Sequence, residues 1–426
     1  MLLACPAPSR DKPPNVVMII SDDHAFSDFG FMGHPTIETP NLDRLAEQSV
    51  RFSNGYVPSS VCRPSLATLL TGLFPHQHGI HFNDPPDKSK RQEAEYLIRA
   101  VPTLPHLLAG ASYRSLQTGK FWEGSYRNAG FTHGMSHGDP TRRYDHPELG
   151  PLRGRHGDLG LTIGRDDMQP IFDFIAASGA NPFLVWYAPL LPHEPHNPPA
   201  RYTKRYEGRG LHSRLVRYYA MCTWFDDTVG ELLRFLDEHD LSSDTLVVFL
   251  SDNGWVNDLT RPWGFAPRSK RSPFEMGVRT PILMRWPGRI EPADHDDLVS
   301  SVDIVPTLLD AAGLTSEAAG LPGASLLPLV TGEATLDRNA VYGEAYTHDA
   351  SRLGDPVADL LYRWIRVGGW KLIDAQDPRR EDMLYSIADD GAEAVNLIDD
   401  PQQLDRVTEL RQQLDAWWNP GRREQR

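Results

Sequence analysis

Short apolar runs that alternate with helical patterns constrain the fold of this chain most. The runs at residues 15–21, 182–188 and 245–251 are rich in β-branched and aromatic residues and show no polar alternation. Such runs are typical of strands buried on both faces of a parallel sheet. Further strands are predicted at residues 51–57, 113–120 and 281–286, and helices at residues 39–47, 103–109, 168–177, 215–239 and 303–312. The pattern predicts an α/β fold in which helices cover both faces of a large, mostly parallel sheet.

The pattern changes after about residue 332. Four short strand-like runs, at residues 342–346, 362–367, 370–374 and 383–386, precede a helical pattern at residues 404–418. We expect a small antiparallel sheet with one helix. The predicted organisation is a disordered leader at 1–14, a catalytic domain at 15–332 and a C-terminal subdomain at 333–426.

Composition limits the partners. The 426 residues carry a net charge of −14, which argues against a nucleic acid or an anionic membrane surface. An anionic substrate would therefore need local positive charge.

No apolar run is long enough to span a bilayer. The start, Met1-Leu2-Leu3-Ala4-Cys5, matches the end of a bacterial lipoprotein signal, although a disordered Pro-rich leader is an equal alternative. We expect an extracytoplasmic, periplasmic location, with a cytoplasmic one as the alternative.

Oxygen-bearing side chains follow two of the predicted strands directly. Asp22 and Asp23 come after the first strand, and Asp252 and Asn253 follow the run at 245–251. The carboxyl ends of parallel strands meet at one edge of a sheet, where α/β proteins bind ligands. Three carboxylates so close would repel one another without a cation, and a set of oxygen ligands suits Ca²⁺. These four residues are the predicted metal ligands.

Cys62 precedes Pro64 and a helix-forming run that ends at Gly72. Proline is tolerated in the first turn of a helix, so Cys62 should lie at a helix N-terminus, which favours a bound anion or a thiolate. At this position and beside the divalent cation, we expect the pKa of the Cys62 thiol to be depressed. A buried, inert cysteine at the start of a core helix is the alternative.

The segment Cys62-Arg63-Pro64-Ser65, followed by Leu-Leu-Thr-Gly, resembles the signature of the type I sulfatases, relatives of alkaline phosphatase. In that family the cysteine is oxidised to formylglycine, whose hydrate is the nucleophile. The resemblance covers nearly the whole chain. It implies an alkaline-phosphatase-like fold, a divalent cation held by the four oxygen ligands with residue 62 as a further ligand, and hydrolysis of a sulfate ester.

Three residues able to carry positive charge match other motifs of the same family. Gly119-Lys120 resembles its Gly-Lys-Trp-His motif, His193 lies in a Pro-His-x-Pro segment, and Lys270 precedes a stretch similar to Tyr-Glu-Gly-Gly-Val-Arg-x-Pro. Hydrolysis of a sulfate ester requires neutralisation of charge on the non-bridging oxygens and on the leaving alkoxide. With Cys62, these three are the predicted catalytic residues.

The chain departs from the family pattern at two positions. Leu66 replaces the arginine of Cys-x-Pro-x-Arg, which helps the modifying enzyme to recognise the segment and anchors the modified residue. Trp122 stands in place of the histidine of Gly-Lys-Trp-His, which assists turnover. Arg63 is not expected to substitute for the missing arginine, because positions i and i+4 share a helix face and position i+1 does not.

Several further residues are weaker candidates. His24, Asp28 and a group of basic residues in the loop at 129–165 could contact substrate, whereas Glu275 and Arg279 are expected to form a structural pair. The basic residues are Arg142, Arg143, Arg153, Arg155 and His156.

Three functions remain open at this point. The first, which we favour, is a sulfatase that acts on a sulfated carbohydrate or an aryl or alkyl sulfate. The second is a metal-dependent phosphodiester or phosphonate hydrolase that uses unmodified Cys62. The third is a non-catalytic protein that binds anionic glycans, and the complete metal and cation set argues against it. The sequence does not name the substrate or the oligomeric state.

Overall fold

Strand β1 (Asn15–Ser21) lies inside the main sheet of the protein, between β7 and β8. The computed structural model describes residues 12–138, 144–146, 150–152 and 159–421. Within these ranges nine strands form the main sheet in the order β10-β2-β9-β8-β1-β7-β3-β4, with β11 also paired to β2. The other strands of this sheet are β2 (Val50–Tyr56), β3 (Arg114–Gly119), β4 (His133–Gly134), β7 (Phe183–Ala188), β8 (Thr245–Ser251), β9 (Arg279–Arg285), β10 (Ala293–His295) and β11 (Val299–Ser300).

The main sheet is mostly parallel, as predicted. β1 pairs in parallel with β7 and β8, β3 pairs in parallel with β7, and β10 and β11 do so with β2. Only β9 runs against its neighbours, pairing antiparallel with β8 and β2 in the described residues. The predicted strands therefore form, but the direction of β9 was not visible in its apolar pattern.

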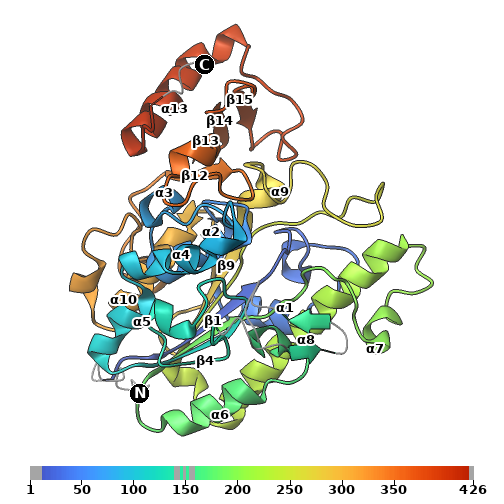
Figure 1. Cartoon of the computed structure of the whole chain (residues 1–426), viewed down its shortest axis with the longest axis vertical. Helices are drawn as coiled ribbons and strands as arrows, with labels where there is room; N and C mark the ends of the chain where they lie inside the picture. The colour runs from blue at the N-terminus through green and yellow to red at the C-terminus, as the bar shows by residue number, and fades with distance from the viewer. Residues whose placement is uncertain (1–11, 139–143, 147–149, 153–158, 422–426) are drawn as a thin grey trace, which may run out of the picture.

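Helices cover both faces of the sheet (Figure 1). Side chains alternate along β1: Val16, Met18 and Ile20 join one apolar core, and Val17 and Ile19 join the other. The first core is completed by α2 (Cys62–Thr71), α5 (Leu104–Leu108) and α10 (Ile304–Ala311), and the second by α1 (Pro40–Glu47), α6 (Gln169–Ser178) and α8 (Ser213–Glu238). This arrangement confirms the predicted two-sided covering.

A second, antiparallel sheet lies near the C-terminus, at the top of Figure 1. It contains β12 (Ala340–Tyr346), β13 (Leu360–Val367), β14 (Trp370–Ala375) and β15 (Met383–Ser386), and α13 (Leu404–Trp417) follows it. Trp364 and Ile373 pack toward the main sheet, whereas Ile365 and Leu372 pack with Leu410 of α13. The predicted antiparallel sheet and helix are thus present. The exact boundary at residue 332 remains a prediction.

Shorter elements connect these parts. They are α3 (Pro75–His78), α4 (Arg91–Glu95), β5 (Tyr144–His146), β6 (Gly150–Leu152), α7 (Ala200–Thr203), α9 (Glu275–Val278), α11 (Leu327–Val330) and α12 (Pro356–Asp359). No helix in the described part of the chain is both long and apolar enough to cross a membrane. Most of the leader predicted at 1–14 lies outside the described residues.

Candidate active site

The carboxyl ends of several neighbouring strands bring the predicted site residues together. Asp22 and Asp23 follow β1, Asp252 and Asn253 follow β8, and Lys120 follows β3. The parallel register aligns Ser21 with Ser251, which places the two oxygen-bearing pairs side by side. Val61 is extended and Cys62 opens α2, so the cysteine lies at a helix N-terminus, as predicted.

Cys62 lies at the centre of this group and is 1% exposed. Its Sγ lies 3.2 Å from the Nζ of Lys120 and 3.2 Å from the Nζ of Lys270. The same sulfur lies 3.7 Å from Oδ1 of Asp23 and 3.9 Å from Oδ1 of Asp22. Two cations and two carboxylates therefore surround residue 62.

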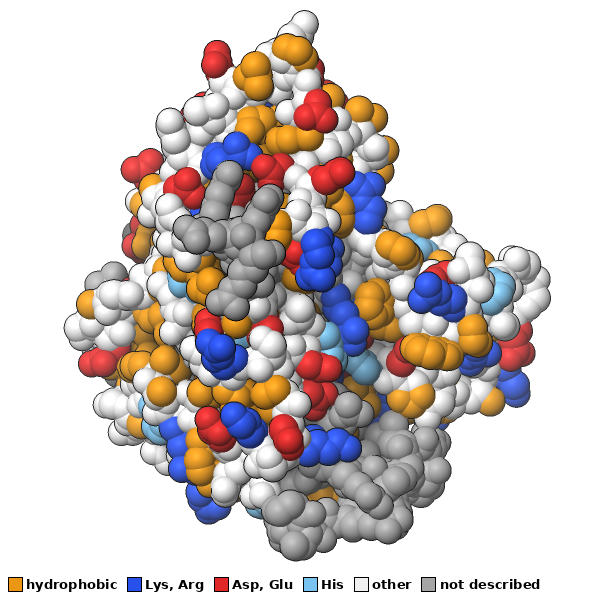
Figure 2. Space-filling view, turned by 45° about the horizontal axis from the view of Figure 1, so that its top comes forward, with side chains coloured by type: hydrophobic (Ala, Val, Ile, Leu, Met, Phe, Trp, Pro, Cys, Tyr) orange, Lys and Arg blue, Asp and Glu red, His pale blue; other side chains and the backbone are white. Residues whose placement is uncertain are grey.

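The charged side chains of the site are paired with one another. Lys120 Nζ lies 2.6 Å from Asp22 Oδ1, and Lys270 Nζ lies 2.6 Å from Asp23 Oδ2. His193 Nε2 lies 3.3 Å from the same Asp23 oxygen. All three predicted cationic or proton-bearing residues thus contact the acidic pair that follows β1. Figure 2 shows Lys, Arg and His side chains gathered along a hollow between the main body and the lobe at the right.

The oxygen ligands fit a divalent cation. Asp252 Oδ1 accepts the backbone N–H of Asp23 at 3.0 Å, and Asn253 Nδ2 donates to Asp23 Oδ1 at 2.7 Å. The remaining oxygens, Asp22 Oδ2, Asp252 Oδ2 and Asn253 Oδ1, are buried and have no hydrogen-bond partner in the described structure. Buried polar atoms normally have a hydrogen-bond partner, so these three oxygens are available as ligands of a divalent cation.

A second set of ligand atoms overlaps with the first. One atom each from Asp22, Asp23, Cys62 and His193 lies within 4.8 Å of the others. His193 was predicted as a catalytic residue and not as a ligand. Its Nε2 already contacts Asp23, and its exposed fraction of 19% leaves it open to substrate.

Burial and the neighbouring charges oppose one another in setting the pKa values of this site. Burial raises the pKa of Asp22 well above its ordinary value, although Lys120 opposes the effect. Burial also acts to raise the pKa of Asp23, but the charges of Lys270 and His193 outweigh it and lower that pKa. From the protein groups alone, burial raises the pKa of the Cys62 thiol more than the two lysines lower it. The predicted depression depends on a divalent cation beside the sulfur and stays a prediction.

Leu66 and Trp122, the two departures from the family pattern, both lie close to Cys62 or Lys120 in the structure. Leu66 is 5% exposed and packs in the apolar core on the α2 face of the sheet. Arg63 points away from residue 62 and forms two hydrogen bonds with Glu123, at 2.9 and 2.8 Å, so it does not substitute for the missing arginine. The ring of Trp122 lies 5.0 Å from the Nζ of Lys120.

Some weaker candidates do not reach the site. His24 is fully buried, and both of its ring nitrogens have protein partners: Ser21 Oγ at 2.7 Å and the carbonyl of Asp28 at 3.1 Å. Asp28 accepts a hydrogen bond from the Tyr218 hydroxyl at 2.9 Å, which gives it a structural partner. The five basic loop residues lie outside the residues whose side chains are described.

The predicted pair of Glu275 and Arg279 has further partners. Their closest charged atoms are 3.8 Å apart, whereas Glu275 lies 2.9 Å from Lys371 and 3.3 Å from Arg366. Glu275 therefore connects the main sheet to the C-terminal sheet. Its role is structural, and its main partners are 91 residues or more away in the sequence.

Two residues near the site were missed. His348, in the segment after β12, contacts Asn83 at 3.1 Å. Burial lowers the pKa of His348, and the charges of Arg271 and Lys270 lower it further. Arg271 follows Lys270 and is exposed. No motif surrounds His348, so only the folding of the C-terminal segment against the main sheet reveals it.

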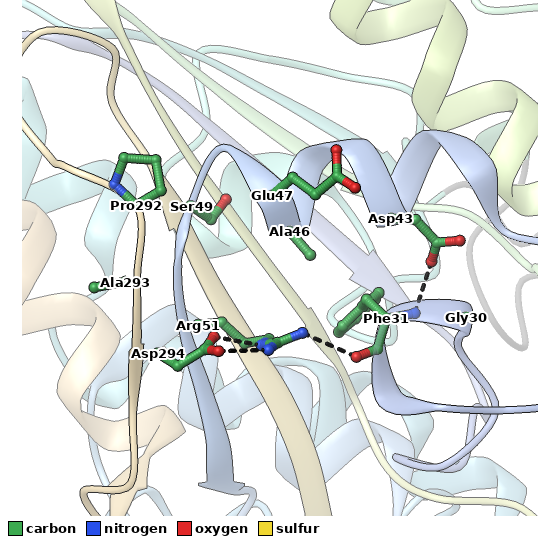
Figure 3. A pocket seen from close by; sticks show the side chains of 10 residues that line it. All are labelled: Gly30, Phe31, Asp43, Ala46, Glu47, Ser49, Arg51, Pro292, Ala293 and Asp294. Atoms are coloured by element: carbon green, nitrogen blue, oxygen red, sulfur yellow. Dashed lines mark hydrogen bonds and ion pairs between the residues drawn. The ribbon is translucent and has the colours of Figure 1, made fainter.

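A pocket elsewhere on the surface involves none of these residues. It has a volume of about 470 Å³, and Figure 3 shows Arg51 joined to Asp294 and to the carbonyl of Phe31, and Asp43 joined to the backbone N–H of Phe31. Arg51 pairs with Asp294 through two hydrogen bonds of 2.7 Å, and Asp43 accepts the backbone N–H of Phe31 at 2.8 Å. Because these groups satisfy one another, the Cys62 site remains the better candidate. The pocket is lined by Gly30, Phe31, Asp43, Ala46, Glu47, Ser49, Arg51, Pro292, Ala293 and Asp294.

Comparison with models of known protein families shows which family this chain belongs to. A family model described as Sulfatase matches residues 14–314, and one described as N-sulphoglucosamine sulphohydrolase, C-terminal, matches residues 264–419. The chain therefore belongs to the sulfatase family, and it is a sulfuric ester hydrolase.

Individual relatives agree with this assignment. N-acetylgalactosamine-6-sulfatase of Rattus norvegicus is 30% identical over 409 residues, covering 87% of this chain and 74% of that protein. The structure of BT4656 in complex with its substrate D-glucosamine-2-N,6-O-disulfate has a TM-score of 0.75 at 22% identity, with 95% and 97% coverage. Phosphonate monoester hydrolase of Agrobacterium radiobacter shares the fold with a TM-score of 0.72 at 18% identity and 95% coverage of both chains.

Proposed function

We propose that the protein hydrolyses the sulfate ester of a sulfated carbohydrate at residue 62. The observation that carries this proposal is the placement of two lysine ammonium groups, each 3.2 Å from Cys62 Sγ and each paired with one of the two aspartates that follow β1. A sulfate group at this position would have its non-bridging oxygens near two fixed positive charges. The sulfated saccharides named for relatives of this chain support a carbohydrate as the substrate.

The proposed metal is Ca²⁺, held by Asp22, Asp23, Asp252 and Asn253 together with residue 62. The ligand oxygens are hard donors, and three of them are buried without another partner. When bound, the cation would neutralise charge on the sulfate and on the group derived from Cys62. It would also balance the three aspartates, which Lys120 and Lys270 alone do not.

The proposed nucleophile is a formylglycine made from Cys62, which would supply a hydrated aldehyde. Lys120 and Lys270 would hold the sulfate oxygens. The Nε2 of His193, 3.3 Å from Asp23, would hold a proton for the leaving alkoxide. Burial at 1% exposure keeps bulk water from residue 62.

One observation favours a second function. Leu66 and Trp122 replace groups that serve the making and the turnover of formylglycine, and a phosphonate monoester hydrolase shares the fold. The alternative is therefore hydrolysis of a phosphate diester or phosphonate ester with unmodified Cys62. A non-catalytic anion-binding role is the third possibility, and detectable turnover of any of these esters would exclude it.

A substrate panel with mass spectrometry separates these functions. Turnover of 4-nitrophenyl sulfate, N-acetylgalactosamine 6-sulfate and D-glucosamine-2-N,6-O-disulfate is compared with that of bis(4-nitrophenyl) phosphate and a phenyl phosphonate ester. The mass of the Cys62 peptide reports conversion to formylglycine. Sulfatase activity with converted Cys62 supports the first function, whereas diester hydrolysis with only free thiol establishes the second.

Variants sharpen this test. Cys62→Ser should be inactive, and Leu66→Arg should raise the converted fraction and the sulfatase turnover together. Leu66→Met is the matched control, because it keeps the apolar volume without adding a charge. An extracytoplasmic location is part of the same proposal, and fractionation of the native host tests it.

A further inference from the structure

The loop between β8 and α9 carries a pocket of about 450 Å³ that the proposed chemistry does not use. Its lining combines apolar rings with cationic side chains. Trp263 is 73% exposed, the most exposed large hydrophobic residue in the described part of the chain. The pocket is also lined by Phe265, Arg261 and Arg271. An exposed aromatic ring in a pocket next to arginines suits a ligand with an apolar face and negative charge.

The loop has a defined shape. Arg214, 4% exposed, donates to the backbone carbonyls of Asp258, of Arg261 at 3.0 Å and of Gly264 at 2.7 Å. Glu194 Oε1 accepts hydrogen bonds from Arg214 at 3.3 Å and from the Gly264 N–H at 3.2 Å. A buried arginine and a carboxylate therefore fix the backbone on both sides of Trp263. Binding a ligand here requires little ordering of the loop.

Arg271 links the pocket to the active site along the chain. Arg271 follows Lys270 directly, and its backbone N–H donates to the carbonyl of Ser60 at 2.9 Å, two residues before Cys62. The guanidinium of Arg271 lies 5.4 Å from the ring of Phe265. Burial lowers the pKa of Arg271, whereas interactions with Asp349, Cys62 and Asp23 oppose that effect, so the guanidinium is within electrostatic reach of the site. The hollow lined by basic side chains in Figure 2 lies beside the lobe at the right.

We propose that this pocket binds a sugar ring of the substrate that carries a second anionic group, a sulfate or a carboxylate. Trp263 would stack on the apolar C–H face of the ring, and Arg271 would bind the second anionic group, with Arg261 adding positive charge at the rim. This inference rests on the proposed function and makes its substrate class more specific. A simple aryl sulfate has no second anion for the arginines.

Steady-state kinetics of the holoenzyme test this subsite. D-glucosamine-2-N,6-O-disulfate is compared with D-glucosamine 6-sulfate and 4-nitrophenyl sulfate. Trp263→Ala should lower kcat/KM for the two sugars by about 5–20-fold, mainly through KM, the usual size for a stacked aromatic anchor. Arg271→Gln should lower kcat/KM for the disulfate by about tenfold or more and thereby remove the preference over the monosulfate.

Controls separate the subsite from general damage. Trp263→Phe should restore most of the affinity for sugars, because it keeps an aromatic face. Leu259→Ala is the matched control, since Leu259 is on the same loop and 42% exposed but does not line the pocket. Unchanged kinetics of Trp263→Ala and Arg271→Gln with the sugars would overturn the proposal, as would equal losses with 4-nitrophenyl sulfate.

A binding measurement keeps this proposal distinct from the proposed function. If the wild-type protein hydrolyses none of the sulfate esters, the proposed function fails. Calorimetry with a disulfated disaccharide then decides the subsite: binding that weakens in Trp263→Ala and Arg271→Gln, but not in Leu259→Ala, supports it. Binding that is absent, or equal in all four proteins, overturns it.

Discussion

Metal binding should stabilise the fold by a measurable amount, because the cation site leaves three buried oxygens unpaired. Asp22 Oδ2, Asp252 Oδ2 and Asn253 Oδ1 have no hydrogen-bond partner in the described structure. A buried unsatisfied polar atom costs about 1–3 kcal/mol. A cation that coordinates all three should therefore stabilise the folded protein by about 3–9 kcal/mol when it saturates the site.

This free energy can be converted into a melting temperature. Unfolding entropy near 60 °C is about 2.1 cal/mol/K per residue, which for 426 residues gives about 0.9 kcal/mol per kelvin. Saturating Ca²⁺ should therefore raise the Tm of chelator-treated protein by about 3–10 °C. Mg²⁺ should do less, because it requires near-ideal octahedral geometry and gives up its waters reluctantly.

Differential scanning fluorimetry of EDTA-treated protein, with Ca²⁺ or Mg²⁺ added back, measures this shift. Asp252→Asn should abolish most of it and should remove activity while preserving the fold. Asp294→Asn is the matched control, because Asp294 is 69% exposed and lies in the other pocket beside Arg51. A Tm that does not respond to any divalent cation, or undiminished turnover by metal-free protein, would refute the reasoning.

Three further predictions follow from single contacts. Lys270→Ala should lower kcat by about 10²–10³-fold if Lys270 stabilises charge formed mainly in the transition state, and a change in KM alone would assign it to uniform binding. Arg63→Ala should destabilise the fold by about 3–5 kcal/mol in urea denaturation, because it leaves the buried carboxylate of Glu123 unpaired, and a loss below 1 kcal/mol would contradict this. Burial raises the pKa of Asp28 from 3.8 to about 6, opposed by its hydrogen bond from Tyr218. A carboxyl group with a raised pKa contributes its full stabilisation below about pH 3.8 and loses it as the pH rises through 6. The free energy of unfolding of Asp28→Asn, relative to that of wild type, should therefore increase by up to about 3 kcal/mol between pH 4 and 7. A difference that does not change with pH would contradict the shift.

Most of the fold could be predicted because local patterns and tertiary packing agree. Strands β1, β7 and β8 are apolar along their whole length, and the structure buries every residue of each. Helix α8 begins and ends within two residues of its predicted bounds. The direction of β9 could not be predicted, since a fully buried strand has the same apolar pattern in a parallel or an antiparallel pair.

The candidate site was predictable where its residues adjoin strand ends or motifs. Asp22, Asp252 and Lys120 each follow a strand, and their convergence is a consequence of the parallel sheet. His348 could not be found, because it reaches Asn83 through the folding of the C-terminal segment against the main sheet. The surroundings of His24 could not be predicted either: its proximity in sequence to Asp23 does not show that its ring is buried against Ser21 and the carbonyl of Asp28.

The departure from the family pattern at position 66 concerns the modification of Cys62 and not the binding of a sulfate group. Leu66 contributes an apolar side chain to the core, so no charge at position 66 assists residue 62. The sulfur is nevertheless 3.2 Å from each of two ammonium groups that the aspartates keep charged, since Asp22 and Asp23 raise the pKa of Lys120 and Lys270 against the effect of burial. The positive charge needed to bind a sulfate group is therefore independent of position 66. The absence of the arginine bears on how Cys62 is modified and anchored, and the substrate-binding cations are retained.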